Sequence, residues 1–229
     1  MVKQIAIAGV VTLGLVVLVE LVMLAKLKSS VNGYATYWKN YSSQGTLVYV
    51  ALGDSAAQGI GASSPNKGYV GLLAQRLADK TDQQVRVVNL SVSGAKIDDV
   101  IKTQVPQLKD YQADVITVEI GGNNVVNDDI TKFEADYEQL AKLLPKGTFV
   151  ADIPYFGGRI RKNAQAVVAS QAIAGSANRY GLKLVKLQQT TKDRDSLLNY
   201  SADLFHPSNR GYRVWTDAFW AAIEPEIKL

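Results

Sequence analysis

The sequence predicts a three-layer α/β/α sandwich built on a five-stranded parallel sheet. Five short runs rich in valine, isoleucine and leucine alternate with longer segments in which apolar residues recur every three or four positions. Short apolar runs are typical of strands that are buried on both faces, and their alternation with helices is typical of a parallel sheet. With 229 residues, the chain is long enough for one domain with a complete core.

The predicted strands and helices follow one another along the chain. The strands are expected at 46–53, 85–91, 113–122, 147–154 and 182–187. Helical periodicity predicts helices over 69–80, 133–144, 163–180 and 209–224. Open parallel sheets bind their ligands at the carboxyl ends of the strands, so we expect the functional residues to follow the strands directly.

The N-terminal segment predicts a transmembrane helix. The run Ile5 to Ala25 is apolar except for Glu20. At about 1.5 Å per residue, a helix of this length matches the ~30 Å hydrocarbon core of a bilayer. Met23-Leu24-Ala25 is a poor signal-peptide cleavage site, so residues 1–26 are expected to remain as an uncleaved signal anchor. A buried core helix is the alternative, although few soluble helices are apolar on every side.

The anchor divides the chain into three parts. Residues 27–45 are polar and contain serine, glycine and tyrosine, which predicts a linker, and residues 46–229 form the predicted domain. Lysines flank the apolar run on both sides, so the charges give no orientation. By analogy with other signal anchors, we expect the domain outside the cytoplasm, at the cell surface or in the periplasm.

Composition excludes several classes of site. The chain has no cysteine and one histidine, so disulfides, thiolate ligands and the usual zinc sites cannot form. We therefore expect no metal and no cofactor. The net charge is only +4, and basic clusters such as Arg159, Arg161 and Lys162 are short, so we expect no nucleic-acid binding.

The lone histidine, His206, lies in the motif DLFHPSNRGY. A single histidine usually has no catalytic task, but Asp203 is close enough in sequence to reach Nδ1 and leave Nε2 for a hydroxyl. Three strand ends supply other polar groups: Ser55 follows the first, Gly94 the second and Asn123 the third. Each motif alone is typical of a turn. Their occurrence together, in order, favours one site.

These motifs resemble the GDSL, or SGNH, hydrolase family over about 47–223. The resemblance implies a flavodoxin-like SGNH hydrolase fold and a catalytic triad. Ser55 would be the nucleophile, His206 the general base and Asp203 its orienting acid. Neither a metal nor a cofactor is implied.

The same resemblance implies an oxyanion hole made by the amides of Ser55 and Gly94 and the side chain of Asn123. One position departs from the family pattern. The third block usually reads Gly-x-Asn-Asp, whereas this chain has Asn124 in the last place. Because Asn123 is kept, we expect catalysis to survive.

The predicted function is a membrane-anchored serine esterase that hydrolyses acyl esters. Its substrate is either a lipid or lysophospholipid ester or an O-acetylated glycan, and its oligomeric state stays open. Tyr155, Phe156 and Arg159 either form a substrate-binding rim or belong to an ordinary loop. The alternative function is a non-catalytic module that binds a glycan or lipid. A nucleotide-binding domain is disfavoured, because the dinucleotide motif needs a third glycine and an acidic residue that are missing here.

Overall fold

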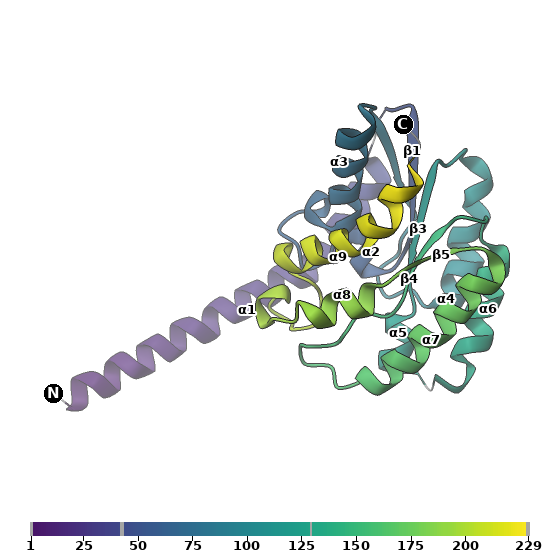
Figure 1. Cartoon of the computed structure of the whole chain (residues 1–229). Coiled ribbons are helices and arrows are strands. Elements are labelled where there is room, and N and C mark those ends of the chain that lie inside the picture. Colours follow the sequence, from purple (N-terminus) through teal and green to yellow (C-terminus); the bar gives the residue numbers. More distant parts are fainter. Residues whose placement is uncertain (1, 42–43, 129, 228–229) are drawn as a thin grey trace.

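The computed structural model describes residues 2–41, 44–128 and 130–227 (Figure 1). Its centre is a parallel sheet with the strand order β2-β1-β3-β4-β5, which confirms the predicted five-stranded sheet and three-layer fold. The strands are β1 (Leu47–Gly53), β2 (Val85–Asn89), β3 (Val115–Glu119), β4 (Phe149–Ala151) and β5 (Lys183–Val185).

The register of the central strands brings the site residues together. β1 pairs with β2 on one side and with β3 on the other, so it is buried along most of its length. Gly53, the last residue of β1, lies opposite Glu119, the last residue of β3. The turns that follow these two strands therefore meet at one edge of the sheet, as expected for parallel strands.

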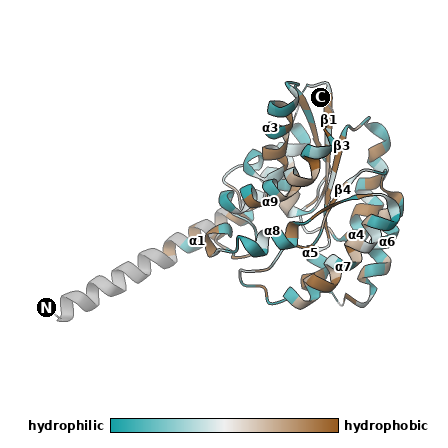
Figure 2. Cartoon of the chain, in the orientation of Figure 1, coloured by the Kyte–Doolittle hydropathy of each residue, from teal (hydrophilic) through white to brown (hydrophobic). Residues whose placement is uncertain are grey.

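Helices cover both faces of the sheet (Figure 1). One face packs against α3 (Tyr69–Thr81) and α9 (Asn209–Ile223), and the other packs against α6 (Phe133–Leu143) and α7 (Asn163–Tyr180). The apolar colours of Figure 2 lie along the strands, while hydrophilic residues cover the outer sides of the helices. Four short helices occupy the connections: α2 (Ser55–Gln58), α4 (Ile97–Asp99), α5 (Gly122–Asn127) and α8 (Leu187–Asp193).

Most of the predicted linker is helical. Helix α1 spans Val2–Asn40 and therefore includes most of the segment 27–45. Its C-terminal part contacts the domain, since Trp38 is buried in the core and Tyr34 Oη donates to the carbonyl of Ala62 at 2.7 Å. Tyr34 and Trp38 are four residues apart and therefore lie on one helical face.

The predicted membrane anchor is not confirmed. Residues 1–26 belong largely to a segment whose side chains lie outside the described part of the structure. Within what is described, no helix is both long and apolar enough to cross a bilayer. Figure 1 shows the N-terminal part of α1 projecting away from the domain.

Candidate active site

The turn after β1 presents Ser55 at the start of a helix. Asp54 is the N-cap of α2, and its Oδ1 accepts a hydrogen bond from the amide of Ala56 at 2.9 Å. Ser55 is the first residue of α2, where the helix itself provides no acceptor for the backbone N–H. This N–H can therefore serve a ligand at the same place as the hydroxyl.

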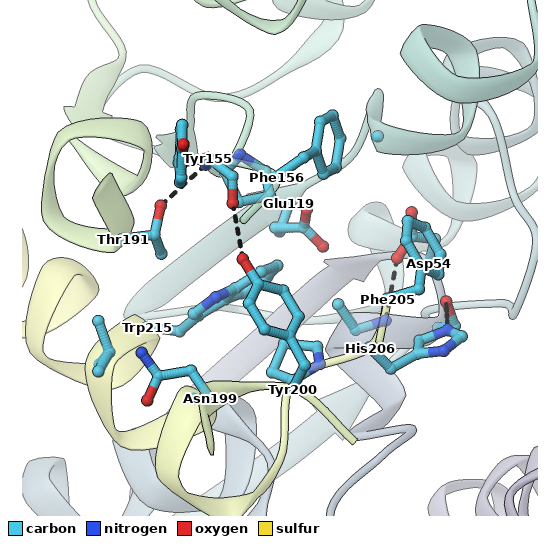
Figure 3. Close-up of a pocket in the computed structure, with 17 residues that line it drawn as sticks. Asp54, Glu119, Tyr155, Phe156, Thr191, Asn199, Tyr200, Phe205, His206 and Trp215 are labelled. Atoms are coloured by element: carbon cyan, nitrogen blue, oxygen red, sulfur yellow. Dashed lines mark hydrogen bonds between the residues drawn. The ribbon is translucent and has the colours of Figure 1, made fainter. Parts of the chain in front are cut away.

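The structure brings Ser55 together with the two predicted partners from the far end of the chain. The Oγ atom of Ser55 lies 3.0 Å from Nε2 of His206. The Nδ1 atom of the same ring lies 2.6 Å from Oδ2 of Asp203. Figure 3 shows His206 at one side of the pocket that opens beside the serine. The three groups form a continuous hydrogen-bonded chain.

Local hydrogen bonds hold Asp203 as a carboxylate. Its Oδ1 accepts from the amides of Phe205 and His206, both at 3.0 Å, and from Oγ of Ser201 at 2.8 Å. Burial raises the pKa of Asp203, but the hydrogen bonds and the charge of His206 outweigh it and hold the pKa below its usual range. The amide of Ser201 also donates to the carbonyl of His206 at 2.8 Å, which closes the loop.

Gly94 lies in the loop after β2 with a backbone φ of 82°. This left-handed conformation favours glycine, and the space where a Cβ would stand is open. Gln58 of α2 braces this loop: its Nε2 donates to the carbonyl of Ser91 at 2.9 Å, and its Oε1 accepts from Oγ of Ser93 at 2.6 Å. Gln58 was not among the predicted site residues.

Asn123 lies at the site, but protein acceptors already engage its amide. Its Nδ2 donates to Oδ2 of Asp54 and to the carbonyl of Ala95, both at 3.0 Å. An amide nitrogen carries two hydrogens, so both have partners in this conformation. The side chain predicted as an oxyanion donor also contacts Asp54, the N-cap of α2.

Asn124 braces the loop around α5. Its Oδ1 accepts from the amide of Ile97 at 3.2 Å, and its Nδ2 donates to Asp128 at 3.3 Å. A carboxylate at 124 would keep the first bond and oppose the charge of Asp128. The neighbouring acid gives a reason for the asparagine at this position.

The predicted rim residues separate into two groups. Tyr155 and Phe156 line the pocket beside Ser55, whereas Arg159 is exposed and lies outside its lining. The backbone of Arg159 contributes differently, because its amide donates to the carbonyl of Leu204 at 2.9 Å. The loop after β4 is thereby tied to the loop that carries the histidine.

Two buried carboxyl groups, those of Asp54 and Glu119, line the same pocket as Ser55. Burial raises the pKa of Glu119 well above its usual range, and the nearby Asp54 adds to the shift. Burial also raises the pKa of Asp54, although the amide of Ala56 and the charge of His206 oppose it. Glu119 lines the pocket and was missed in the sequence, although it is the one charged residue in an apolar strand.

Metal ligands do not cluster in the described parts of the chain: no three histidine, cysteine, aspartate or glutamate side chains there could hold an ion together.

The geometry is that of a serine hydrolase on a parallel α/β sheet. The model of the GDSL-like lipase/acylhydrolase family matches residues 51–214, so the chain belongs to this family and is a carboxylic ester hydrolase. No curated protein matches the sequence.

Solved structures share the fold. The structure of TesA is similar with a TM-score of 0.66 and 21% identity, over 79% of this chain and 99% of that one. The W215I variant of Axe2, an acetyl xylan esterase from Geobacillus stearothermophilus, gives 0.65 and 20%, over 80% and 97%. A lipase/acylhydrolase from Enterococcus faecalis gives 0.65 and 16%, over 80% and 98%.

Proposed function

We propose that this esterase uses Ser55 as its nucleophile, His206 as its general base and Asp203 as the group that orients the imidazole. The hydrogen-bonded chain of 3.0 Å and 2.6 Å that joins the three side chains carries this proposal. A serine hydroxyl needs such a base, because it is a weak nucleophile until its proton is removed.

The reaction proceeds in two halves. Oγ of Ser55 forms a bond to the ester carbonyl carbon while its proton passes to Nε2 of His206. The tetrahedral intermediate then collapses, the bond to the alcohol breaks, and His206 gives the proton to the departing alkoxide. Water attacks the acyl-serine with His206 again as base, and the carboxylic acid and the free hydroxyl are released. Asp203 remains ionised and stabilises the imidazolium in both halves.

The oxyanion is stabilised by the amides of Ser55 and Gly94, with Asn123 as the third donor. Because both hydrogens of the Asn123 amide have acceptors, one must turn from Asp54 or Ala95 toward the oxyanion during the reaction. Such a donor acts in the transition state more than in the ground state, which raises kcat.

A fluorophosphonate probe tests the nucleophile. Wild-type protein should be labelled at Ser55, and Ser55→Ala should lose both labelling and ester hydrolysis with an unchanged circular dichroism spectrum. Labelling that persists in Ser55→Ala refutes the assignment, and an unlabelled wild type supports the non-catalytic binding module instead.

We also propose that residues 1–26 anchor the enzyme in a membrane with the domain outside the cytoplasm. The apolar sequence from Ile5 to Ala25 supports this location. Substrates would then be acyl esters of lipids or of O-acetylated glycans near the bilayer, with Arg159 as an outer contact. Full-length protein should resist extraction by carbonate, and protease added to cells with an opened outer envelope and an intact cytoplasmic membrane should digest the domain. Release by carbonate contradicts the anchor, and protection from protease contradicts the orientation.

A further inference from the structure

Three leucines next to the pocket are exposed to solvent, and we call them the leucine patch. Leu197 and Leu198 lie in a single helical turn, Leu197–Asn199, where their exposed fractions are 64% and 68%, and Leu204 is 40% exposed. The pairing of Tyr200 with Pro207 joins the turns that carry these leucines. The residues that follow the leucines in the chain line the pocket: Asn199, Tyr200 and Phe205.

Local structure does not account for leucine at these positions. Ser208 holds the helical turn through its Oγ, which donates to the carbonyl of Leu198 at 2.7 Å, and this bond needs no apolar side chain. Leu204 has a backbone φ of 52°, in the left-handed region that leucine adopts at a cost and that glycine or asparagine adopts readily. A group of exposed apolar side chains that does not serve the fold is typical of an interaction surface.

Basic residues surround the leucine patch. The amide of Arg159 donates to the carbonyl of Leu204 at 2.9 Å, so this residue lies beside the patch. Gly211 of α9 packs against the carbonyl of Asn199, which brings the exposed Arg210 next to the helical turn. The segments 159–162 and 208–213 contain five basic residues and no acidic one: Arg159, Arg161, Lys162, Arg210 and Arg213. The segment 192–195 adds two residues of each sign, so this face is positive.

Helix α1 leaves the domain on the same side. Its Tyr34 binds the carbonyl of Ala62, and the amide of the next residue, Ser63, donates to Oδ1 of Asn209 at 2.8 Å, at the start of α9. Figure 1 shows α8 and the start of α9 on the side from which the N-terminal part of α1 projects. Tyr34 and Ala25, the end of the apolar run, are separated by about 14 Å of unbroken helix. The headgroup layer occupies about 5–8 Å of such a distance, so a bilayer around the apolar run lies close to this face.

We propose that the leucine patch docks onto the surface of a membrane that contains anionic lipids. The leucines enter the boundary between headgroups and acyl chains, and Arg159, Arg210 and Arg213 contact the headgroups. Apolar side chains surrounded by basic ones are the combination that binds such a surface. The inference rests on the proposed membrane location of the enzyme, which brings α1 to the bilayer. Docking holds the pocket at the membrane surface in one orientation.

A fluorescent probe at Leu198 tests the docking. The chain contains no cysteine, so Leu198→Cys can be labelled at this position alone with the NBD fluorophore, which emits at shorter wavelength in apolar surroundings. Leu143→Cys is the matched control, because Leu143 is 53% exposed and ends α6 before β4, at the opposite end of the sheet. Both full-length proteins are reconstituted into vesicles of phosphatidylcholine and phosphatidylglycerol. The Leu198 probe should emit at shorter wavelength than the Leu143 probe, and spin-labelled lipid should quench it more strongly.

Equal emission and equal quenching of the two probes overturn the docking. A shift at Leu198 that grows with protein concentration and resists spin-labelled lipid shows a second copy of the chain on the patch, which also overturns it. If circular dichroism shows that Leu198→Cys does not fold, the same label at Leu197 decides the question.

Charge variants test the basic residues. In labelled Leu198→Cys, the pair Arg210→Gln and Arg213→Gln should lower the ratio of docked to undocked protein by about tenfold or more, since each basic residue at an anionic surface is worth about fivefold. The control pair Lys109→Gln and Lys146→Gln removes the same charge before β3 and β4, at the other end of the sheet, and should leave the ratio unchanged. Equal effects of the two pairs, or equal docking in pure phosphatidylcholine, overturn the proposal.

Two further measurements on the same proteins separate this inference from the proposed function. Release from the vesicles by carbonate contradicts the anchor, and failure to hydrolyse p-nitrophenyl acetate contradicts the esterase. An active protein that resists carbonate, but whose Leu198 probe remains in water, keeps the proposed function and overturns the docking.

Discussion

Two aspartates contact the proposed catalytic groups, and their surroundings affect them in opposite ways. Asp203 lies in the segment 201–206, here called the histidine loop. It accepts hydrogen bonds from an imidazole, two amides and a hydroxyl, and its pKa is lowered although burial opposes this. Asp54 lies in the turn 53–55 after β1, here called the nucleophile turn after the proposed role of Ser55. It accepts hydrogen bonds from one amide and from Asn123, and burial raises its pKa. The number of donors, and not burial alone, determines whether the pKa of each carboxyl falls or rises.

This difference in pKa corresponds to different roles for the two segments. The histidine loop holds a negative charge next to the imidazole, and the proposed role of His206 as a base that becomes a cation requires such a charge. In the nucleophile turn, the carboxyl oxygens of Asp54 instead cap a helix and hold Asn123. We therefore expect mutations in the histidine loop to affect kcat most, and mutations around Glu119 to affect stability.

The largest effect is expected for Asp203→Asn. The amide cannot balance the imidazolium and favours the wrong tautomer of His206, so kcat should fall by about 10³–10⁴. Ser201→Ala is the matched control: it removes one of the hydrogen bonds to Asp203 and leaves the carboxylate in place. Steady-state kinetics on p-nitrophenyl acetate measures both. If kcat fell as much in Ser201→Ala as in Asp203→Asn, the conformation of the loop, and not the charge of Asp203, would determine kcat.

Asn123→Ala should lower kcat by about 10²–10³ with little change in KM, as expected for a donor used in the transition state. Asn124→Asp is the neighbouring control. It retains the acceptor for the amide of Ile97 and brings a charge toward Asp128, so its kcat should stay within about threefold of the wild type and its melting temperature should fall. A greater loss of kcat in the Asn124 variant would show that the donor is misassigned.

Sequence reasoning predicted the parts of the site that depend on motifs and on strand order. The apolar runs predicted the sheet, and parallel pairing then required the turns after β1 and β3 to meet. The spacing of Asp203 and His206 was enough to predict their contact. The sequence can predict these contacts because a single turn, or the end of a single strand, determines where the residues lie relative to one another.

The features that the sequence did not predict depend on side chains packed from distant segments. Burial among core residues raises the pKa of Glu119, and its own strand does not reveal this. The contacts of Asn123 with Asp54 require the folded turn. The docking of Trp38 onto the domain joins α1 to Gln58, which comes after the first strand. Propensity and motifs describe neighbours in the chain, and these contacts join residues remote from one another.

Glu119→Gln should make stability less dependent on pH. Burial raises the folded-state pKa of Glu119 above its model value of 4.5, so the folded protein binds the proton more tightly than the unfolded chain. The stability from this group is present below pH 4.5 and is lost as pH rises, by up to about 1.4 kcal/mol per pH unit. Glutamine does not titrate, so the variant should gain stability over the wild type at neutral pH relative to acid pH.

Urea unfolding of the wild type and of Glu119→Gln, at about pH 5 and about pH 7.5, measures this change in the free energy of unfolding. Asp203 has the opposite sign, because its pKa is lowered on folding and its contribution is present above the unfolded value of 3.8. Asp203→Asn is therefore the control, and it should lose stability over the whole range from about pH 5 to about pH 7.5. An identical pH dependence in wild type and Glu119→Gln would contradict the raised pKa of Glu119.

The smallest effect concerns the support that the nucleophile turn receives from α1. Nε1 of Trp38 donates to the carbonyl of Gln58 at 2.9 Å, and the side chain of Gln58 holds the loop before Gly94. Trp38→Phe should cost about 0.5–1.5 kcal/mol for the lost hydrogen bond, more if packing is lost, and lower kcat about twofold to threefold. Tyr34→Phe also removes one bond from α1, to the carbonyl of Ala62, but has no such link to Gly94.

For Tyr34→Phe, the free energy of unfolding should fall by about as much as for Trp38→Phe, while kcat stays unchanged. Thermal unfolding and steady-state kinetics on the two variants separate these outcomes. A loss of kcat that follows stability equally in both would mean that α1 only stabilises the fold. A loss confined to Trp38→Phe would mean that this helix positions the amide of Gly94, so the nucleophile turn depends on a segment outside the sandwich while the histidine loop supports itself.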